Sequence, residues 1–571
     1  VCTQSMMSST RIRNRKIRTM FALNTLLLIG ALTCAEEHVS SMSASDRNVE
    51  EFCFVRGSQK VMLTDTCMSL GRVGQTTLDV QGMRGEAEHI QMVIPPWFLP
   101  ASDGTGELEL QFPSLTLQHL PNSNTTSNRI IPASNIVPAL VGFVNCTTTT
   151  RYSPSGGGWH PDPLFIDMVQ PIRLQSNVAN SIFVRVNIPR TIEAGTYIGT
   201  VKASYAGNTT VKGLAFSFDI NVVVWNATLP EPEQMYKDFG EIWSFTFNDW
   251  TGNDTANTTT QAYLDMMSDH LLPPDSLYKN KPYTEFSVYE YLNTTGKQLL
   301  NLADISNLDG AYDTDCTKAY TEEYIASTLA MLEPTITKLQ ASGILDTKQA
   351  YVYGYDEQPA SCEKNIRTLF GAVKAKWPFI TTAAVLNWKG GLPVDLPVDV
   401  WILQYEDYNA DNAKTWKAAG KKQFWYHCIE PSGGAYLNTF IERPWVQGRL
   451  LYWLAARENV DGWLYYATDL WIPHPGKTIQ GIQPIVNSSL TTYDPANYIW
   501  SPRTDIFANG DGQFIYPGGG EWSGKPVGTA RLANMRDAVE DQVLLQMVRN
   551  AGKETQLQEA IAKLVRSATD H

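Results

Sequence analysis

The chain has 571 residues, of which 43% are hydrophobic and 18% are charged. This much apolar material excludes wholesale disorder and suffices for two or more sizeable cores. The net charge of −13 argues against nucleic acid as a partner, and the 11% of aromatic residues suits a protein that stacks on the flat apolar faces of sugars.

Residues 1–35 have the layout of a secretory signal. Positions 1–19 carry basic residues and no acidic ones, an apolar run extends from Met20 to Leu32, and small residues lead to Ala35. The run is short for a membrane span. We therefore predict cleavage after Ala35, no stable membrane span in the mature chain, and a secreted protein or one held in the secretory-pathway lumen. An uncleaved signal anchor is the alternative.

Cysteines and N-glycosylation sequons also fit an exported glycoprotein. Six cysteines follow the signal, which permits disulfides, and Cys53 with Cys67 is the most plausible local pair. No cysteine–histidine cluster has zinc-ligand spacing, so we predict no metal and no other cofactor. The sequons that could carry glycans are Asn124, Asn145, Asn208, Asn226, Asn253, Asn257, Asn293 and Asn487.

After a polar linker over residues 36–50, residues 51–230 have the pattern of an antiparallel β-sandwich. Hydrophobic residues recur with period two in short runs, and Gly, Pro and Asn clusters separate these runs at short intervals. The clearest runs are 88–94, 181–188 and 216–222.

Residues 231–571 alternate between strand-like and helix-like runs. Repeated βα units of this kind favour a (β/α)8 barrel, and no GxGxxG motif supports a dinucleotide-binding sheet. The stretch 468–528 is too long for an ordinary connection and is expected to be an insertion on the active-site face. Predicted strands are 240–247, 350–355, 379–386, 398–405, 423–429 and 462–467; predicted helices are 262–272, 321–342, 362–377, 409–419, 440–458 and 530–565.

Acidic and aromatic residues gather where the predicted barrel strands end. In a (β/α)8 barrel, these carboxyl ends hold the reactive groups. Carboxylates can perform acid/base chemistry there and aromatic rings can stack on sugar rings, so the pattern predicts a sugar site. The strand ends in question are Asp356-Glu357, Asn387-Trp388, Glu406-Asp407, Tyr426-His427 and Tyr465-Tyr466.

The adjacent pair Asp356 and Glu357 is the sharpest of these features. Retaining glycosidases ordinarily place two carboxyls ~5 Å apart across the scissile bond, which neighbouring residues cannot easily do. Neighbours can instead act from one side: one protonates the leaving oxygen while the other holds a 2-acetamido group that supplies the nucleophile. Close like charges also help to keep one carboxyl protonated near neutral pH. An exposed acidic dipeptide in a loop is the alternative.

Motifs in a characteristic order and spacing extend over most of residues 75–545. They include Arg84-Gly85-Glu86-Ala87-Glu88, Pro161-Asp162-Pro163-Leu164, Tyr355-Asp356-Glu357, Trp425-Tyr426-His427-Cys428, Asp461-Gly462-Trp463-Leu464-Tyr465-Tyr466 and Gly510-Asp511-Gly512. In these motifs the chain resembles glycoside hydrolase family 123, whose members are β-N-acetylgalactosaminidases built from a β-sandwich and a (β/α)8 barrel.

The resemblance implies roles for the acid pair. Glu357 would be the general acid/base. Asp356 would orient and polarise the 2-acetamido group as it attacks the anomeric carbon and forms an oxazolinium intermediate. Catalysis would be retaining, without a covalent bond to the enzyme.

We expect Tyr426, Tyr466 and Trp471 to line the sugar pocket, with packing inside the barrel as the alternative for each. Asp511 is expected to bind sugar hydroxyls, or else to cap its glycine-flanked turn. Tyr466 stands where a member of the family is expected to have Trp, a departure that bears on substrate preference more than on chemistry.

The leading hypothesis is an exo-acting glycosidase that removes terminal β-linked N-acetylgalactosamine from a glycan or glycoconjugate. One alternative is a non-catalytic glycan-binding surface protein that kept the fold. Another is a β-N-acetylhexosaminidase for a different 2-acetamido sugar. The sequence does not fix the oligomeric state.

Overall fold

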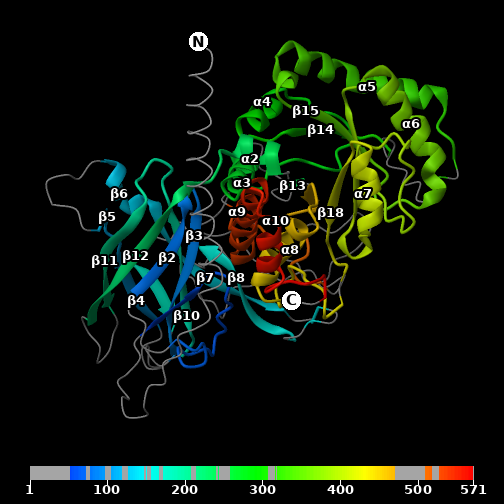
Figure 1. Ribbon diagram of the computed structural model, residues 1–571. Coiled ribbons are helices and arrows are strands. Elements are labelled where there is room, and N and C mark those ends of the chain that lie inside the picture. The colour runs from blue at the N-terminus through cyan, green and yellow to red at the C-terminus, as the bar shows by residue number, and fades with distance from the viewer. Residues whose placement is uncertain are drawn as a thin grey trace, which may run out of the picture.

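The computed structural model of the protein describes residues 52–569, apart from 73–76, 97–104, 119–126, 147–148, 151–152, 154–155, 166–170, 176, 207–213, 240–241, 244–257, 307–315, 317, 432, 470–507 and 517–525. The expected signal and linker lie outside the described residues, as do Trp471 and most of the long insertion. Two parts lie side by side, a β-rich part formed by the first half of the chain and a mixed helix-and-strand part formed by the second (Figure 1).

Two sheets make up the first part. One has the strand order β1 (Cys53–Arg56), β3 (Ala87–Ile94), β10 (Asn180–Asn187), β7 (Ile136–Cys146), β8 (Gly158–Phe165). The other has the order β2 (Thr77–Arg84), β12 (Leu214–Thr228), β11 (Gly195–Ala206), β4 (Thr105–Gln111), β9 (Ile172–Gln175), with β5 (Leu115–Leu117) beside β11 and β6 (Ile130–Ile131) beside β5. All these pairs are antiparallel except β12 with β2. The prediction of antiparallel sheets here is confirmed.

The two sheets share one hydrophobic core, and the period-two pattern explains why. Ile182, Val184 and Val186 of β10 are buried in the same cluster as Phe218 and Ile220 of β12, which belongs to the other sheet. Alternate side chains of a strand point to the same face, so each run contributes every second residue to this core. The predicted Cys53–Cys67 disulfide is present, and it closes the loop between β1 and the segment that follows.

A parallel sheet forms the centre of the second part. Its order is β13 (Ile242–Trp243), β19 (Gly462–Leu464), β18 (Lys422–Tyr426), β17 (Val400–Gln404), β16 (Thr381–Val385), β15 (Gln349–Gly354), β14 (Leu299–Asp304). Within the described residues no pairing joins β13 to β14, so the strands form a half-barrel, and the closed eight-stranded barrel stays a prediction.

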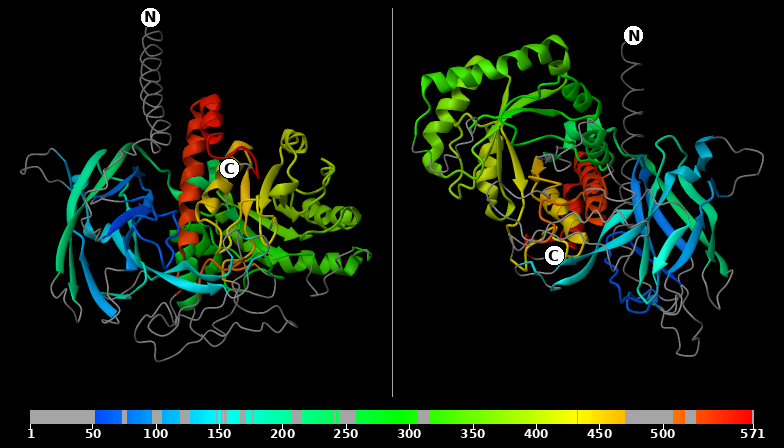
Figure 2. Two further views of the ribbon diagram at one scale, coloured as in Figure 1. Left: turned by 90° about the horizontal axis from the view of Figure 1, so that it is seen from below. Right: turned by 180° about the vertical axis from the view of Figure 1, so that it is seen from behind.

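Helices cover the outside of this half-barrel, as both views of Figure 2 show. They are α2 (Pro232–Phe239), α3 (Thr258–Asp269), α4 (Ser287–Thr294), α5 (Glu322–Ala341), α6 (Glu363–Lys376), α7 (Ala410–Ala418), α8 (Val446–Arg457), α9 (Ala530–Asn550) and α10 (Glu554–Ile561). Short 3-10 helices are η4 (Ser127–Arg129), η5 (Ala133–Asn135), η6 (Ile344–Asp346), η7 (Ala360–Cys362) and η8 (Tyr405–Asp407).

Several elements differ from their prediction, and helices α2 and α4 were not predicted. The predicted helix 530–565 is divided into α9 and α10, because Gly552 (φ 75°) adopts the left-handed conformation that ends a helix. The predicted helix 440–458 begins only at Val446, after a buried loop that contains Pro444. Strand β14 was not predicted at all, although its Leu299-Leu300 pair and buried pattern are typical of a parallel strand.

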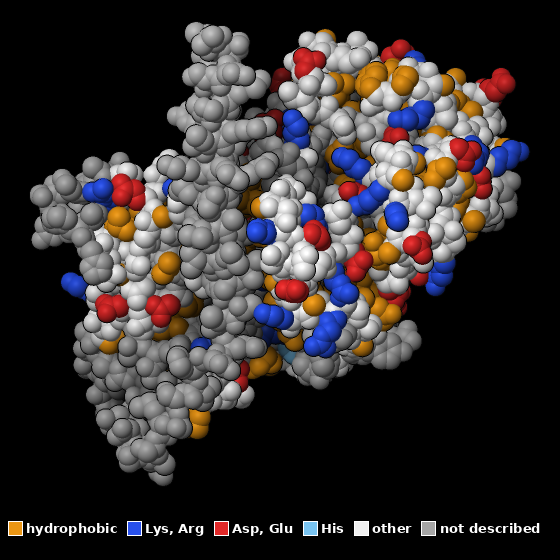
Figure 3. All heavy atoms as spheres, viewed as in Figure 1, with side chains coloured by type: hydrophobic (Ala, Val, Ile, Leu, Met, Phe, Trp, Pro, Cys, Tyr) orange, Lys and Arg blue, Asp and Glu red, His pale blue; other side chains and the backbone are white. Residues whose placement is uncertain are grey.

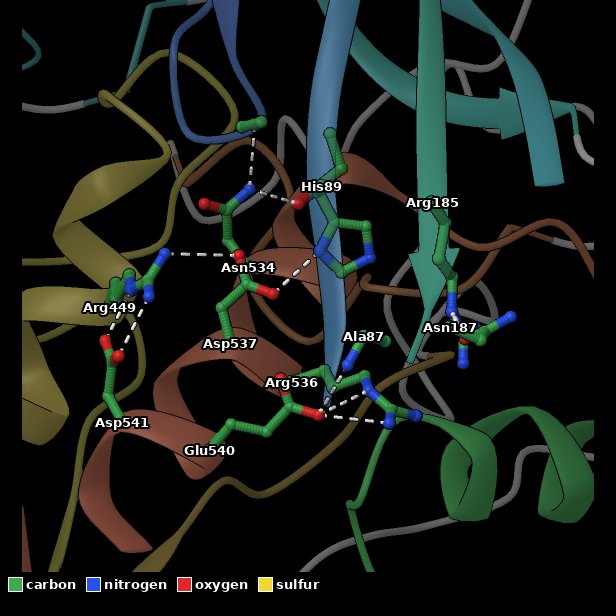
Figure 4. Close-up of polar contacts among 12 residues, drawn as sticks. Ala87, His89, Arg185, Asn187, Arg449, Asn534, Arg536, Asp537, Glu540 and Asp541 are labelled. Atoms are coloured by element: carbon green, nitrogen blue, oxygen red, sulfur yellow. Dashed lines mark hydrogen bonds and ion pairs between the residues drawn. The ribbon is translucent and has the colours of Figure 1, made fainter. Parts of the chain in front are cut away.

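Buried polar contacts join the two parts of the protein. Figure 4 shows α9 against β3, where the Nδ1 atom of His89 lies 2.7 Å from Oδ1 of Asp537. Nearby, the backbone N–H of Ala87 donates to Glu540 at 3.1 Å. Since unpaired charges are costly to bury, these contacts specify how α9 docks on the sheet.

Charges of both signs are interspersed on the helical face seen in Figure 3. Within the residues that the structure describes, no helix is long and apolar enough to cross a membrane.

Candidate active site

Strand β15 delivers the acid pair to the carboxyl edge of the parallel sheet. Tyr355 (φ 59°) and Glu357 (φ 55°) both adopt left-handed backbone conformations, which cost non-glycine residues on the order of 1–3 kcal/mol each. The hydroxyl of Ser306, two residues after β14, accepts a hydrogen bond from the backbone N–H of Tyr355 at 2.9 Å. The surrounding fold therefore holds a strained turn that carries two successive carboxylates at the end of β15.

Asp356 is held by a tyrosine of its own strand. Its Oδ1 accepts a hydrogen bond from the hydroxyl of Tyr353 at 2.6 Å. Burial, and then the nearby charges of Glu357 and Asp304, raise the pKa of Asp356 to about 7, against the hydrogen bonds of Tyr353 and Tyr278, which lower it. The carboxyl thus titrates near neutral pH and prefers a ligand that donates a hydrogen bond to it.

Glu357 is more exposed and is held from the neighbouring strands. Its Oε1 accepts a hydrogen bond from the hydroxyl of Tyr426, the last residue of β18. The side-chain amide of Asn387 donates to that same hydroxyl at 2.7 Å, and its Oδ1 accepts a hydrogen bond from the backbone N–H of Gln404 at 3.0 Å. Residues after β16, on β17 and on β18 therefore fix the Tyr426 hydroxyl that meets Glu357, which is one of the contacts that the sequence could not specify.

Asp511 forms a second acidic point, together with two tyrosines that follow β19. Tyr466 donates to Oδ2 of Asp511 at 2.7 Å and Tyr465 donates to Oδ1 at 3.1 Å. Asp511 stands between Gly510 and Gly512, whose φ angles of 83° and 71° permit the tight turn. The structure thus brings Asp511 and Tyr466 together. Each carboxylate oxygen of Asp511 accepts a hydrogen bond from a tyrosine hydroxyl.

Cys428 packs beside tyrosines of both acidic points, Tyr426 next to Glu357 and Tyr466 next to Asp511. Burial raises the pKa of its thiol, and the charges of Asp511, Glu357 and Asp356 raise it further. The charges of all three carboxylates therefore act on this half-buried thiol. Tyr426 and Tyr466 pack in the same hydrophobic cluster as Cys428.

Asp304 at the end of β14 is a site residue that the sequence reasoning missed. Its Oδ1 accepts from the hydroxyl of Ser306 at 2.9 Å and from the backbone N–H of Ser306 at 3.1 Å. Burial raises the pKa of Asp304 to about 6 despite these bonds. The sequence does show an acidic residue at the end of an apolar run. Because strand β14 was not predicted, that residue could not be assigned to the carboxyl edge of the sheet.

A disulfide and a tryptophan fix the loop that follows the acid pair. Cys316 is bonded to Cys362, which the sequence did not single out as a pair. The indole N–H of Trp388 donates to the carbonyl of Gln358 at 2.8 Å. The predicted pocket residue Trp471 lies outside the described residues. Within the described part of the chain, no group of three or more His, Cys, Asp or Glu side chains is arranged to hold a metal ion.

The site combines two adjacent carboxylates with several tyrosines at the carboxyl edge of a parallel half-barrel. This combination is typical of a glycosidase. The comparisons agree: residues 284–548 match the family model "Glycoside hydrolase 123, catalytic domain". Residues 284–548 therefore form a glycoside hydrolase 123 catalytic domain, and the protein is a glycoside hydrolase. No curated protein matches it.

Among solved structures, a family 123 glycoside hydrolase from Clostridium perfringens, studied for its hydrolysis of glycolipid glycans, matches with a TM-score of 0.63. The identity is 13%, over 90% of this chain and 92% of that one, so the likeness shows the fold alone. A β-glucuronidase from Parabacteroides merdae matches with a TM-score of 0.26 and 12% identity over 63% of this chain and 48% of that one, which carries no argument.

Proposed function

We propose that the protein is a retaining exo-glycosidase that removes terminal β-linked N-acetylgalactosamine, with the substrate's own 2-acetamido group as the nucleophile. The observation that carries this proposal is the placement of Asp356 and Glu357 as neighbours at the end of β15, each bonded to a different tyrosine. Two such carboxyls act from one side of the sugar, which suits substrate-assisted chemistry.

In the first step, Asp356 accepts a hydrogen bond from the acetamido N–H and orients the acetamido oxygen below the anomeric carbon. That oxygen forms a bond to the anomeric carbon while the glycosidic bond breaks. Glu357 gives its proton to the departing oxygen. The products are the aglycone alcohol and an oxazolinium ion, whose positive charge the Asp356 carboxylate stabilises.

In the second step, the Glu357 carboxylate takes a proton from a water molecule. The water oxygen bonds to the anomeric carbon on the face that the aglycone left, and the bond to the acetamido oxygen breaks. Glu357 is protonated again, and the released sugar has the β-configuration of the substrate.

Tyr426, Tyr466, Trp471 and Asp511 are proposed to line the sugar pocket. Tyr426 is the best supported, because its hydroxyl contacts Glu357 directly. Tyr466 and Asp511 are bonded to each other and lie near the same thiol as the acid pair. Asp511 would need to exchange a tyrosine hydroxyl for a sugar hydroxyl in order to bind substrate.

We further propose that the protein is exported and that its parallel half-barrel belongs to a (β/α)8 architecture behind a β-sandwich. Two disulfides support export, since such bonds persist mainly in oxidising compartments. Expression of the full sequence, followed by N-terminal sequencing of the mature chain, would test the expected cleavage after Ala35.

The test of the proposed activity is hydrolysis of paired aryl glycosides, the β-N-acetylgalactosaminide and the β-N-acetylglucosaminide, with and without a thiazoline mimic of the oxazolinium. Cleavage of the first, blocked by the thiazoline, would support both sugar and mechanism. Preference for the second would correct the sugar. Cleavage that the thiazoline leaves unchanged would contradict substrate assistance.

A further inference from the structure

A cavity of about 660 Å³ lies away from the acid pair, between the first sheet and the start of α8. Its walls come from the Cys53–Cys67 loop, from β8 and from the loop that precedes α8. This volume falls within the range of sites that hold small molecules. None of the residues that contact Asp356 or Glu357 lines it.

Cationic side chains dominate the charge of this cavity. Arg56, Lys60 and Arg72 line it, with Glu442 as the one carboxylate among the described lining residues. Glu442 is already committed, because the N–H and hydroxyl of Thr150 donate to it at 2.8 Å each. Three cations in one cavity stand out in a chain whose net charge is −13.

The side chains of Arg56 and Arg72 do not contribute polar contacts to the fold of the described residues. Within the described part of the chain, neither guanidinium has a hydrogen bond or an ion pair. Their backbones are nevertheless fixed: Arg56 ends β1, and the N–H of Arg72 donates to the carbonyl of Cys67 at 2.8 Å. The disulfide therefore holds two free guanidinium groups beside one cavity.

Lys60 supplies a third, buried cation. Its ammonium donates to the carbonyl of Ile441 and, at 3.4 Å, to Nδ1 of His160, which leaves one of its three N–H groups available. Burial lowers the pKa of Lys60 to about 8, against the charge of Asp162 and others, which raise it. A bound anion would offset that desolvation.

The rest of the lining is mixed: Met62, Pro444 and Val446 contribute apolar surface, and Ser58, Gln59 and His160 contribute polar groups. A bare inorganic ion gains nothing from apolar surface, whereas the C–H face of a sugar ring does. We propose that this cavity is a second saccharide site, which binds a sugar bearing a carboxylate or a sulfate, with Arg56, Arg72 and Lys60 around the anion.

The test is calorimetric titration of the full-length protein with three ligands that share one scaffold: 3′-sialyllactose, 3′-sulfolactose and neutral lactose. None carries a terminal N-acetylgalactosamine. We expect at least one anionic ligand to bind about tenfold or more tightly than lactose, and more weakly as NaCl rises. Equal binding of lactose, or no binding of either anionic ligand, would overturn the proposal.

Variants locate the site. Arg56→Gln with Arg72→Gln should weaken binding of the anionic saccharide about tenfold and leave hydrolysis of a neutral aryl glycoside unchanged. Lys202→Gln, an exposed cation on β11 of the other sheet, is the matched control and should bind as wild type. Unchanged binding by the double variant would contradict the assignment. Displacement of the saccharide by equimolar inorganic sulfate would show a site for free anions only, and would contradict the saccharide assignment.

Discussion

Tyr353 donates a hydrogen bond to Asp356, three residues further along the chain, at 2.6 Å. This contact joins the end of β15 to the carboxylate that is proposed to hold the acetamido group. Because a hydrogen bond to the charged form favours ionisation, Tyr353 works against the burial that raises the pKa of Asp356. The pair therefore sets the pH at which the site is ready for substrate.

The pH dependence follows from that balance. Asp356 must be ionised to accept the acetamido N–H, so kcat/KM should fall as pH drops below about 7. Tyr353→Phe removes the favourable hydrogen bond and should move this acid limb to higher pH. Asp304→Asn removes a nearby negative charge and should move it to lower pH. Shifts in the same direction in pH–rate profiles of the two variants would contradict the assignment.

Glu357→Gln should discriminate between leaving groups. An activated aryl glycoside needs little protonation of its leaving oxygen, whereas a natural glycan needs it fully, so the natural substrate should lose about 10²–10⁴-fold and the aryl glycoside much less. Parallel kinetics on the two substrates measure this difference. The control is Glu363→Gln on α6, where the acid pairs with Arg367 on the surface. Equal losses on both substrates would count against Glu357 as the acid.

Asp356→Asn should impair both substrates to a similar degree, by about 10²-fold or more, because the nucleophile is no longer polarised whatever the leaving group. Kinetics with saturating aryl glycoside, alongside thermal unfolding to show that the variant folds, would measure this. Wild-type turnover by a folded Asp356→Asn protein would remove Asp356 from the mechanism.

A buried ion pair at the interface of the two parts should dominate stability. Arg531 on α9 is bidentate to Asp162 on β8, at 2.7 and 2.8 Å, and also donates to the carbonyls of Gly510 and Gln513 on either side of Asp511. Asp162→Asn leaves the guanidinium without its counter-charge and should cost about 3–5 kcal/mol.

Denaturant unfolding would measure this cost, with Asp395→Asn as the control. Asp395 forms an exposed pair with Arg367, so its loss should cost far less stability than the loss of Asp162. Similar losses from the two substitutions would show that burial of the Asp162–Arg531 pair does not matter.

The acidic cluster between β3 and α9 predicts a stability that falls with pH. Burial, and then the charge of Glu540, raise the pKa of Glu86 to about 8. A folded-state pKa above the unfolded value means that the folded protein holds a proton that the unfolded chain has released. Stability from this group is therefore present below about pH 4.5 and is lost as pH rises to about 8.

Glu86→Gln mimics the protonated acid permanently. Its Tm should match wild type at pH 5 and exceed it at pH 8, whereas Glu109→Gln, an exposed acid on β4, should change neither value. A Tm difference from wild type that is the same at both pH values would contradict the raised pKa.

Local patterns made much of this architecture predictable. Period-two runs located the antiparallel sheets, and Asp356-Glu357 at a strand end marked the acid pair. Contacts between residues distant in the chain were not predictable: Tyr426 reaches Glu357 only because β18 and β15 share one sheet, and Asp304 comes near Asp356 only because β14 is the neighbour of β15. The Cys316–Cys362 bond likewise depends on how the loops fold, since spacing alone leaves many pairings open.

The most direct test of substrate assistance varies the nucleophile itself. In a series of aryl β-N-acetylgalactosaminides, fluorine atoms added one at a time to the acetyl methyl group withdraw electrons from the acetamido oxygen and weaken its attack. Substrate assistance predicts that kcat/KM falls with each fluorine, while the aglycone is unchanged. A kcat/KM that is independent of fluorine content would contradict it.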